Sequence, residues 1–133
     1  MIPLAKQKKQ LEKRIAELEN QIKIELINRA DIIELNEGFS FGQGNYAMFK
    51  QGKHYWGYVV IKKDSGTFTN KQESVGKFKI NMRGVINSFC ALSDSEWSSK
   101  YFGYTYIQQD SITICSASEN GNTAKLYIDI VVI

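Results

Sequence analysis

The chain has 133 residues, of which 43% are hydrophobic and 23% are charged, and its formal net charge is +3. This length suits a single domain with one additional long helix. The basic residues occur singly or in pairs, which argues against nucleic-acid binding, and no apolar run is long enough for membrane insertion.

An apolar stripe marks the N-terminal part of the chain. Leu11, Ile15, Leu18 and Ile22 recur at spacings of four, three and four residues, among many Lys and Glu residues. So narrow a stripe is typical of a coiled coil, because a single helix of this kind has little to bury. We predict a helix over residues 4–35 that assembles with copies of itself; an amphipathic helix lying on its own domain is the alternative. The predicted oligomerisation positions are Leu4, Leu11, Ile15, Leu18, Ile22, Leu26 and Ile33.

The residue types at the heptad positions indicate how many helices join the coil. Ile15 and Ile22 occupy a positions and leucines occupy d positions, which favours a parallel dimer. After Ile22 the apolar positions move four residues out of phase, and we interpret this shift as a stutter that loosens the coil.

The composition changes near residue 38, which divides the chain into a predicted coiled-coil stalk (1–37) and a head domain (38–133). The stalk has seven basic and seven acidic residues, whereas the head has ten and seven and therefore carries the whole charge of +3. The glycine-rich segment 38–44 lacks the features of a phosphate loop, and we expect a flexible joint there.

The head is predicted to be mainly β. Short segments rich in β-branched and aromatic residues alternate with turn residues, which indicates an antiparallel β-sandwich of jelly-roll type. Alternate residues of strand 54–62 share a face, and neither face is plainly polar. One face has Tyr55, Gly57, Val59 and Ile61, and the other has His54, Trp56, Tyr58 and Val60. We expect one face to meet the core and the other a partner or a ligand. The predicted strands are 46–50, 54–62, 76–80, 85–92, 101–108, 111–116 and 125–132.

Catalysis has little support in the sequence. His54 is the single histidine, and no nucleophile motif accompanies it. Asp94 and Glu96 could form a carboxylate pair, yet two acids in one Ser-rich loop more often solvate that loop. Cys90 and Cys115 have no ligand partner at metal spacing, so we expect two buried thiols. We therefore predict a protein that is not an enzyme and has no cofactor or metal.

Saccharide binding asks for less specialised chemistry. A sugar presents C–H faces to aromatic rings and hydroxyls to polar side chains. The loop 93–101 (SDSEWSSKY) supplies both kinds of group, although Trp97 could instead fold back onto the head. The candidate saccharide-binding residues are Trp97, Asp94, Glu96 and Tyr101 in this loop and His54, Trp56 and Arg83 elsewhere.

Several motifs in the head resemble one family of proteins. They are YAMFKQG at 46–52, GKF at 76–78, GYTYI at 103–107 and SITI at 111–114, with an alternating run around Gly57. This pattern resembles the C-terminal head domain of siphophage tail-tip proteins, the receptor-binding proteins and upper-baseplate fibres of phages that infect Gram-positive bacteria. The resemblance covers most of residues 45–133, and the preceding helix is similar to the stalk of such proteins.

The resemblance implies a homotrimer at the tip of a phage tail, made in the host cytoplasm, since the sequence begins without a signal peptide. It also implies binding to host cell-wall polysaccharide or teichoic acid and contacts with other baseplate and tail proteins. The heptads alone leave a dimer open. Two other functions remain as alternatives: a structural fibre domain that docks another tail protein without binding glycan, and a depolymerase with two opposed acids in a cleft.

Overall fold

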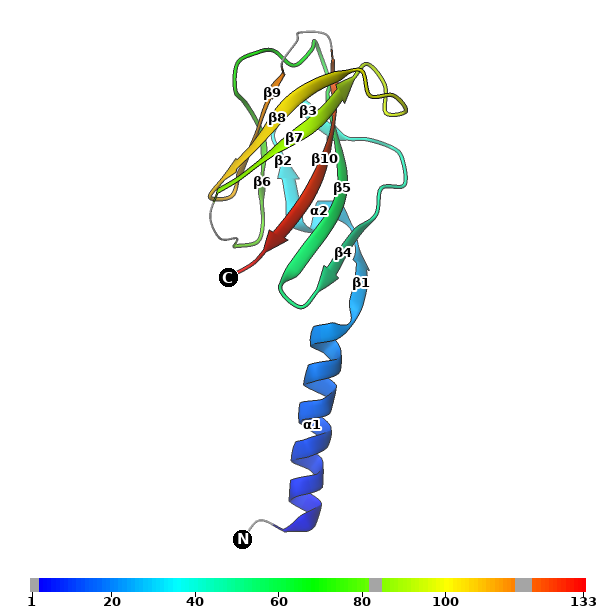
Figure 1. The fold of residues 1–133 in the computed structure, drawn as a ribbon, viewed down its shortest axis with the longest axis vertical. Coiled ribbons are helices and arrows are strands. Elements are labelled where there is room, and N and C mark those ends of the chain that lie inside the picture. Colours follow the sequence, from blue (N-terminus) through cyan, green and yellow to red (C-terminus); the bar gives the residue numbers. More distant parts are fainter. Residues whose placement is uncertain (1–2, 82–84, 117–120) are drawn as a thin grey trace.

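The structure, a computed structural model, consists of a long helix and a β-rich head (Figure 1). It describes residues 3–81, 85–116 and 121–133, with residues 85–89 as backbone alone. The C-terminus lies in the lower half of the head, and the N-terminus lies at the far end of the helix (Figure 1).

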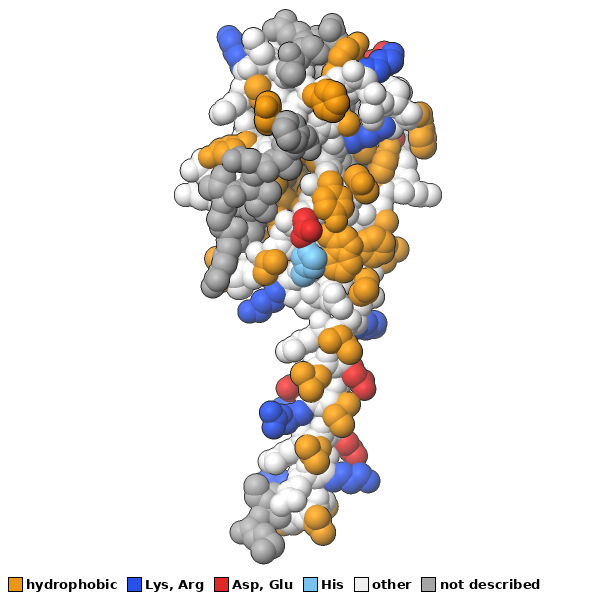
Figure 2. All heavy atoms as spheres, in the orientation of Figure 1, with side chains coloured by type: hydrophobic (Ala, Val, Ile, Leu, Met, Phe, Trp, Pro, Cys, Tyr) orange, Lys and Arg blue, Asp and Glu red, His pale blue; other side chains and the backbone are white. Residues whose placement is uncertain are grey.

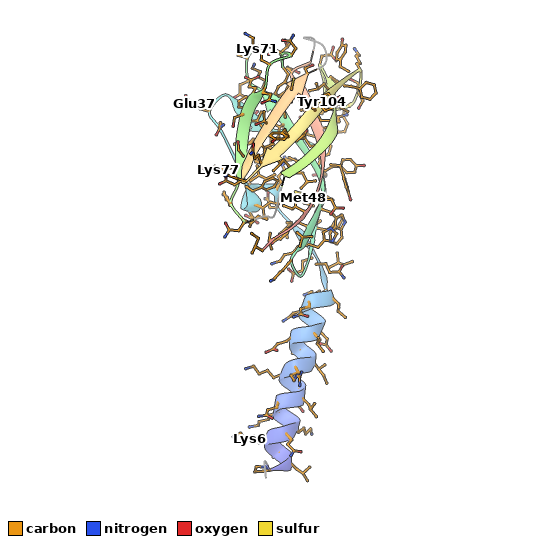
Figure 3. The ribbon with its side chains drawn as sticks, turned by 60° about the vertical axis from the view of Figure 1, so that its left-hand side comes forward. Lys6, Glu37, Met48, Lys71, Lys77 and Tyr104 are labelled. Carbon is orange, nitrogen blue, oxygen red and sulfur yellow. The ribbon has the colours of Figure 1, made fainter. Side chains whose placement is uncertain are left out.

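The helix α1 (Leu4–Ile22) consists mostly of strong helix formers such as Leu, Lys, Glu and Gln. It begins after Pro3, whose carbonyl accepts hydrogen bonds from the N–H groups of Lys6 and Gln7 at 3.1 Å. None of the described residues of α1 is buried, and their side chains project into open space around it (Figure 3). The alternative of a helix lying on its own domain is therefore wrong.

The prediction that the helix continues to residue 35 is also wrong. Residues 24–35 form β1 (Ile24–Ile27), the single turn α2 (Arg29–Ile32) and β2 (Ile33–Leu35). Lys23 already has an extended backbone, with φ −69° and ψ 127°. The shift in apolar spacing after Ile22, which we interpreted as a stutter, marks the change from a helical period to the two-residue period of a strand.

Two of the predicted oligomerisation positions consequently lie in the head. Leu26 is an exposed residue of β1, where it pairs with Phe49. Ile33 lies in the core with 1% of its surface exposed, so its assignment to the stalk seam is wrong. Ile33 is buried because β2 pairs with β6 and thereby faces the interior of the head.

The head is mainly β, as predicted, and its described strands form one curled antiparallel sheet of ten. The strand order is β1-β4-β5-β10-β7-β8-β9-β6-β2, and β3 pairs with β5. The seven predicted strands are present with ends that differ by at most three residues, whereas β1, β2 and β3 were not predicted. The remaining strands are β3 (Phe39–Phe41), β4 (Met48–Gln51), β5 (His54–Lys63), β6 (Glu73–Phe78), β7 (Val85–Ser93), β8 (Tyr101–Gln108), β9 (Ser111–Ser116) and β10 (Thr123–Val131).

One hydrophobic core fills the inside of the curl. The face of β5 that carries Tyr55, Val59 and Ile61 points into this core, as we expected for one of the two faces of the strand. Each large aliphatic side chain buried there contributes about 1.5–3 kcal/mol. The core draws on most strands of the sheet, from β5 to β2 in the strand order: Ile33, Val59, Ile61, Val75, Phe78, Leu92, Ile107, Ile112, Ile114, Leu126, Ile128 and Ile130.

The backbones of β4 and β5 approach each other closely at Gly57. Its φ is +144°, and a Cβ at this position would lie 2.4 Å from the carbonyl oxygen of Ala47 and 2.8 Å from Cα of Met48. Both atoms belong to backbone and cannot move aside by a side-chain rotation. Glycine is therefore required here by conformation and by space.

We predict that Gly57→Ala lowers the free energy of unfolding by about 3 kcal/mol, through backbone strain and displacement of β4. Gly66→Ala is the matched control, since Gly66 also has a positive φ (+76°) but has nothing within 4 Å of its Cβ position. The control is expected to cost only about 1 kcal/mol. Chemical denaturation of the full chain compares the two variants, and equal losses would contradict the close approach at Gly57.

Candidate functional site

A polar hollow of about 560 Å³ lies between two loops of the head. One wall is the segment 43–45, which follows β3, and the other is the segment 94–97, which follows β7. The two segments are about 50 residues apart in the sequence and meet at the hollow. We call this site the Trp97 hollow, and its lining consists of Gln43, Gly44, Asn45, Lys62, Asp94, Ser95, Glu96 and Trp97.

Glu96 joins the two walls of the Trp97 hollow. Its Oε1 accepts a hydrogen bond from the Gln43 N–H at 2.8 Å, and its Oε2 accepts one from the Gly44 N–H at 3.0 Å. Lys62 Nζ lies 3.7 Å from Oε1, and the Glu96 side chain is 9% exposed. Charge-assisted bonds of this kind are stronger than bonds between neutral groups.

The same contacts change the acidity of Glu96. The hydrogen bond from the Gln43 N–H lowers the pKa of Glu96 below its ordinary value, while burial opposes this effect. The Gly44 N–H and the positive charge of Lys62 lower the pKa further. Glu96 is consequently ionised at neutral pH, and its carboxylate holds the two walls of the hollow together.

Arg29 of α2 holds the segment 42–46 from its other side. Its guanidinium donates a hydrogen bond to the Gly42 carbonyl and lies 5.0 Å from the ring centroid of Phe41 and 6.0 Å from that of Tyr46. The Tyr46 hydroxyl donates to the Glu96 carbonyl at 3.4 Å. Burial raises the pKa of Tyr46, and the charge of Glu96 raises it further, so this hydroxyl keeps its proton. The wall of the hollow is thus fixed on both sides.

Trp97 stands at the edge of the hollow and is 83% exposed. The alternative in which Trp97 folds back onto the head is therefore wrong. The loop beneath it is braced by serines: the Ser93 hydroxyl donates to the Ser95 carbonyl, and Ser95 Oγ lies 3.2 Å from Ser98 Oγ. Short-range serine bonds of this type stabilise turns. The indole is presented to solvent on an ordered loop.

The structure brings together three of the predicted site residues, and the other described ones lie elsewhere on the head. Asp94, Glu96 and Trp97 line one hollow. Tyr101 begins β8 and packs half-buried against the core. Arg83 lies outside the described residues.

His54 and Trp56 lie on the outward side of β5, outside the lining of the hollow. His54 Nε2 is 2.5 Å from Asp129 Oδ1 on the neighbouring strand β10. The His54 and Trp56 rings are 4.7 Å apart between centroids. These residues belong to a second surface of the head, which also carries other aromatic side chains.

Sequence reasoning missed the wall formed by residues 43–45 and the contribution of Lys62. The prediction of a flexible joint at 38–44 is wrong, because Phe39–Phe41 forms β3 against β5 and the Phe39 ring stacks on Phe68 at 6.2 Å. The alternation Phe-Ser-Phe was a signal for this strand. No local signal relates Lys62 to Glu96, since that contact depends on the topology of the sheet.

The two cysteines differ in their surroundings. Cys90 is buried, and burial raises the pKa of its thiol. Cys115 is only partly buried, so our expectation for this residue was wrong; its thiol lies 3.2 Å from the Asn70 carbonyl. Within the described residues, no group of three or more His, Cys, Asp or Glu side chains is arranged to hold a metal ion. Among the described helices, none has the length and apolarity needed to cross a membrane.

Comparisons with known proteins identify no relative of this chain: no family model, no curated protein and no solved structure matches it. Interpretation of the Trp97 hollow therefore depends on its own geometry and chemistry.

We predict that Glu96→Gln lowers the melting temperature at neutral pH, because an amide cannot accept both hydrogen bonds as an ionised carboxylate does. The folded pKa of Glu96 lies below its ordinary value of 4.5, so the stabilisation is fully present above that pH. It is lost as the pH falls through the folded pKa. Thermal denaturation of both proteins over an acidic pH series should show the difference in melting temperature shrinking towards zero.

Asp94→Asn is the matched control for Glu96→Gln. Asp94 lies on the same loop, but its ion pair with Lys100, at 3.4 Å, has side chains 63% and 54% exposed. Exposed pairs contribute about 0.5 kcal/mol or less, so this variant should melt close to the wild type at each pH. A difference for Glu96→Gln that does not change with pH would contradict the role of the ionised carboxylate.

Proposed function

We propose that this chain is a self-associating binding protein, not an enzyme, and that the Trp97 hollow of its head binds a saccharide of a bacterial cell surface. The observation that carries this proposal is the exposed Trp97 indole beside a hollow lined by polar groups. An indole face can stack on the C–H face of a sugar ring, and the adjacent groups can bond its hydroxyls.

The polar groups of the hollow include both donors and acceptors. Lys62 Nζ can donate, the exposed carboxylate of Asp94 can accept, and the lining includes Gln43 and Asn45, whose side-chain amides can do both. Glu96 is occupied by its contacts with the backbone, so it serves to fix the wall rather than to react. This division of roles supports binding over hydrolysis, because glycoside hydrolysis needs two available carboxyl groups about 5–9.5 Å apart.

The charge of the hollow favours a neutral sugar over an anionic polymer. Its lining has two acidic side chains, Asp94 and Glu96, and one basic side chain, Lys62. A polyanion such as teichoic acid would find one basic side chain in this lining, and Lys62 is already paired with Glu96. We therefore propose neutral cell-wall polysaccharide as the ligand, with teichoic acid as the alternative that binding experiments can separate.

A coiled-coil stalk would raise the strength of such binding. One shallow site binds loosely, whereas several linked sites on a repeating polymer gain about 10²–10⁴ in avidity. The apolar stripe of α1 supports self-association, and the described residues of this helix bury none of it within their own chain. A homotrimer follows from the resemblance to phage tail-tip proteins, and a dimer from the heptads.

The resemblance also supports the tail tip of a phage as the setting of this protein. A structural role, in which the head docks another tail protein without binding glycan, is the second candidate. It is favoured by a broad exposed apolar surface elsewhere on the head, which includes Tyr58, Tyr127 and Val131.

We predict that Trp97→Ala weakens binding of the full chain to isolated Gram-positive cell walls about tenfold or more, through loss of stacking at each linked site. The measurement is co-sedimentation of the protein with walls, followed by titration with purified neutral wall polysaccharide and with teichoic acid. Competition by the neutral polymer is the expected result.

Phe102→Ala is the matched control, because Phe102 is 75% exposed on β8 and does not line the hollow. It should bind as the wild type does. Retention of full binding by Trp97→Ala, or absence of binding by the wild type to walls of any host tested, would refute saccharide binding at this site.

A further inference from the structure

A second surface of the head consists of aromatic and aliphatic side chains that point outward from four neighbouring strands. Leu26, Phe49, Trp56 and Asp129 lie in one row across β1, β4, β5 and β10, and Tyr58 faces Tyr127 in the next row. Side chains paired in this way point to the same side of a sheet. We call this surface the outer aromatic face, and it consists of Ile24, Leu26, Phe49, Trp56, Tyr58, Tyr127 and Val131.

The rings of this face pack against one another but stay open to solvent. Phe49 and Trp56 stack at 5.7 Å between centroids, and Tyr58 meets Tyr127 edge-on at 5.2 Å. Even so, Tyr58 remains 58% exposed and Leu26 72% exposed. Contiguous exposed apolar side chains are typical of interaction surfaces.

The outer aromatic face continues directly into the apolar stripe of α1. Lys23 alone separates Ile22 at the end of the helix from Ile24 at the start of β1. The Gln51 side-chain amide donates to the Ile22 carbonyl at 2.7 Å, so the end of the helix is tied to β4. Figure 2 shows apolar side chains along the helix and around the single histidine of the head on the same side of the molecule.

One pair of charged residues on the helix favours a parallel orientation of copies that assemble through it. With Ile15 and Ile22 at a positions, Arg14 is at g and Glu19 is at the following e position. In a parallel coil these residues of two copies carry opposite charges at facing positions, which favours parallel alignment in register. Parallel helices would place the heads side by side at one end of the coil.

We infer that the outer aromatic face packs against the head of a second copy of this chain, as a continuation of the interface that begins along α1. The inference rests on the self-association in the proposed function and deepens it. The face suits a second copy because its seven residues are uncharged, and the charged groups beside it on the same side of β10 are occupied: Asp129 is paired with His54, and Lys125 donates to the Ser98 carbonyl. Two such surfaces meet without repulsion between like charges.

The first experiment measures assembly of the full chain by sedimentation velocity over a dilution series. Tyr58→Glu introduces a charge into the face and should raise the midpoint concentration of dissociation about tenfold or more. The control is Tyr104→Glu, since Tyr104 is similarly exposed (55%) on β8 outside this face, and it should assemble as the wild type does. Circular dichroism verifies that both variants are folded.

The second experiment leaves the face uncharged and measures its protection. In a Cys115→Ser background, Tyr127→Cys and Tyr104→Cys are labelled with a maleimide. Labelling is repeated after the stalk is disrupted by Ile15→Glu and Leu18→Glu. The thiol at position 127 should react slowly in the assembled protein and faster once the stalk is disrupted. The thiol at position 104 should react at the same rate with the intact and the disrupted stalk.

The outcomes separate this inference from the proposed function. An assembled protein in which position 127 reacts as fast as it does without the stalk would overturn the inference, because the face would then be open to some other protein. Self-association and saccharide binding would both stand in that case. A wild type that is monomeric at micromolar concentration would overturn the inference and the stalk together, while Trp97→Ala still tests the saccharide site by itself.

Discussion

The antiparallel ladder between β5 and β10 determines which side chains the head buries and which it presents. Residues 54–62 pair with residues 123–131 without interruption, so the alternation of each strand is kept over its length. Val59 and Leu126 therefore enter the core, while Tyr58 and Tyr127 remain outside. Further along the outward side of β5, Val60 is covered by the chain at Gly42, and Lys62 enters the Trp97 hollow. One strand thus supplies the core, the aromatic face and the candidate ligand site.

The walls of the Trp97 hollow are loops, and specific contacts hold these loops in place. Glu96 accepts two backbone hydrogen bonds from the opposite wall, and Arg29 holds that wall from behind. These contacts satisfy backbone groups that would otherwise require water. The ionised carboxylate therefore has a structural role, and Trp97 and Asp94 remain available at the surface. A site preorganised in this way would lose little conformational entropy on binding the proposed saccharide.

The long strands could be predicted from the sequence because alternation and turn residues agree with the final pairing. The helix was predicted well as far as Ile22. Beyond it, Leu26 and Ile33 continued a helical spacing with a shift of phase, but pairing with β4 and β6 stabilises an extended chain instead. Short apolar runs cannot decide between these outcomes, since the decisive partners are distant in sequence. For the same reason, the loop 93–101 could be identified as a candidate from its composition, whereas residues 43–45 could not.

The direct passage of α1 into β1 has a mechanical consequence. Tension applied to the stalk enters the head along β1, whose hydrogen bonds to β4 run across the line of pull. These bonds are loaded together in shear, rather than opened one after another as in a zipper. The bond from Gln51 to the Ile22 carbonyl reinforces the point where the load enters. A head tethered at its far end would therefore transmit force to its stalk through several parallel bonds.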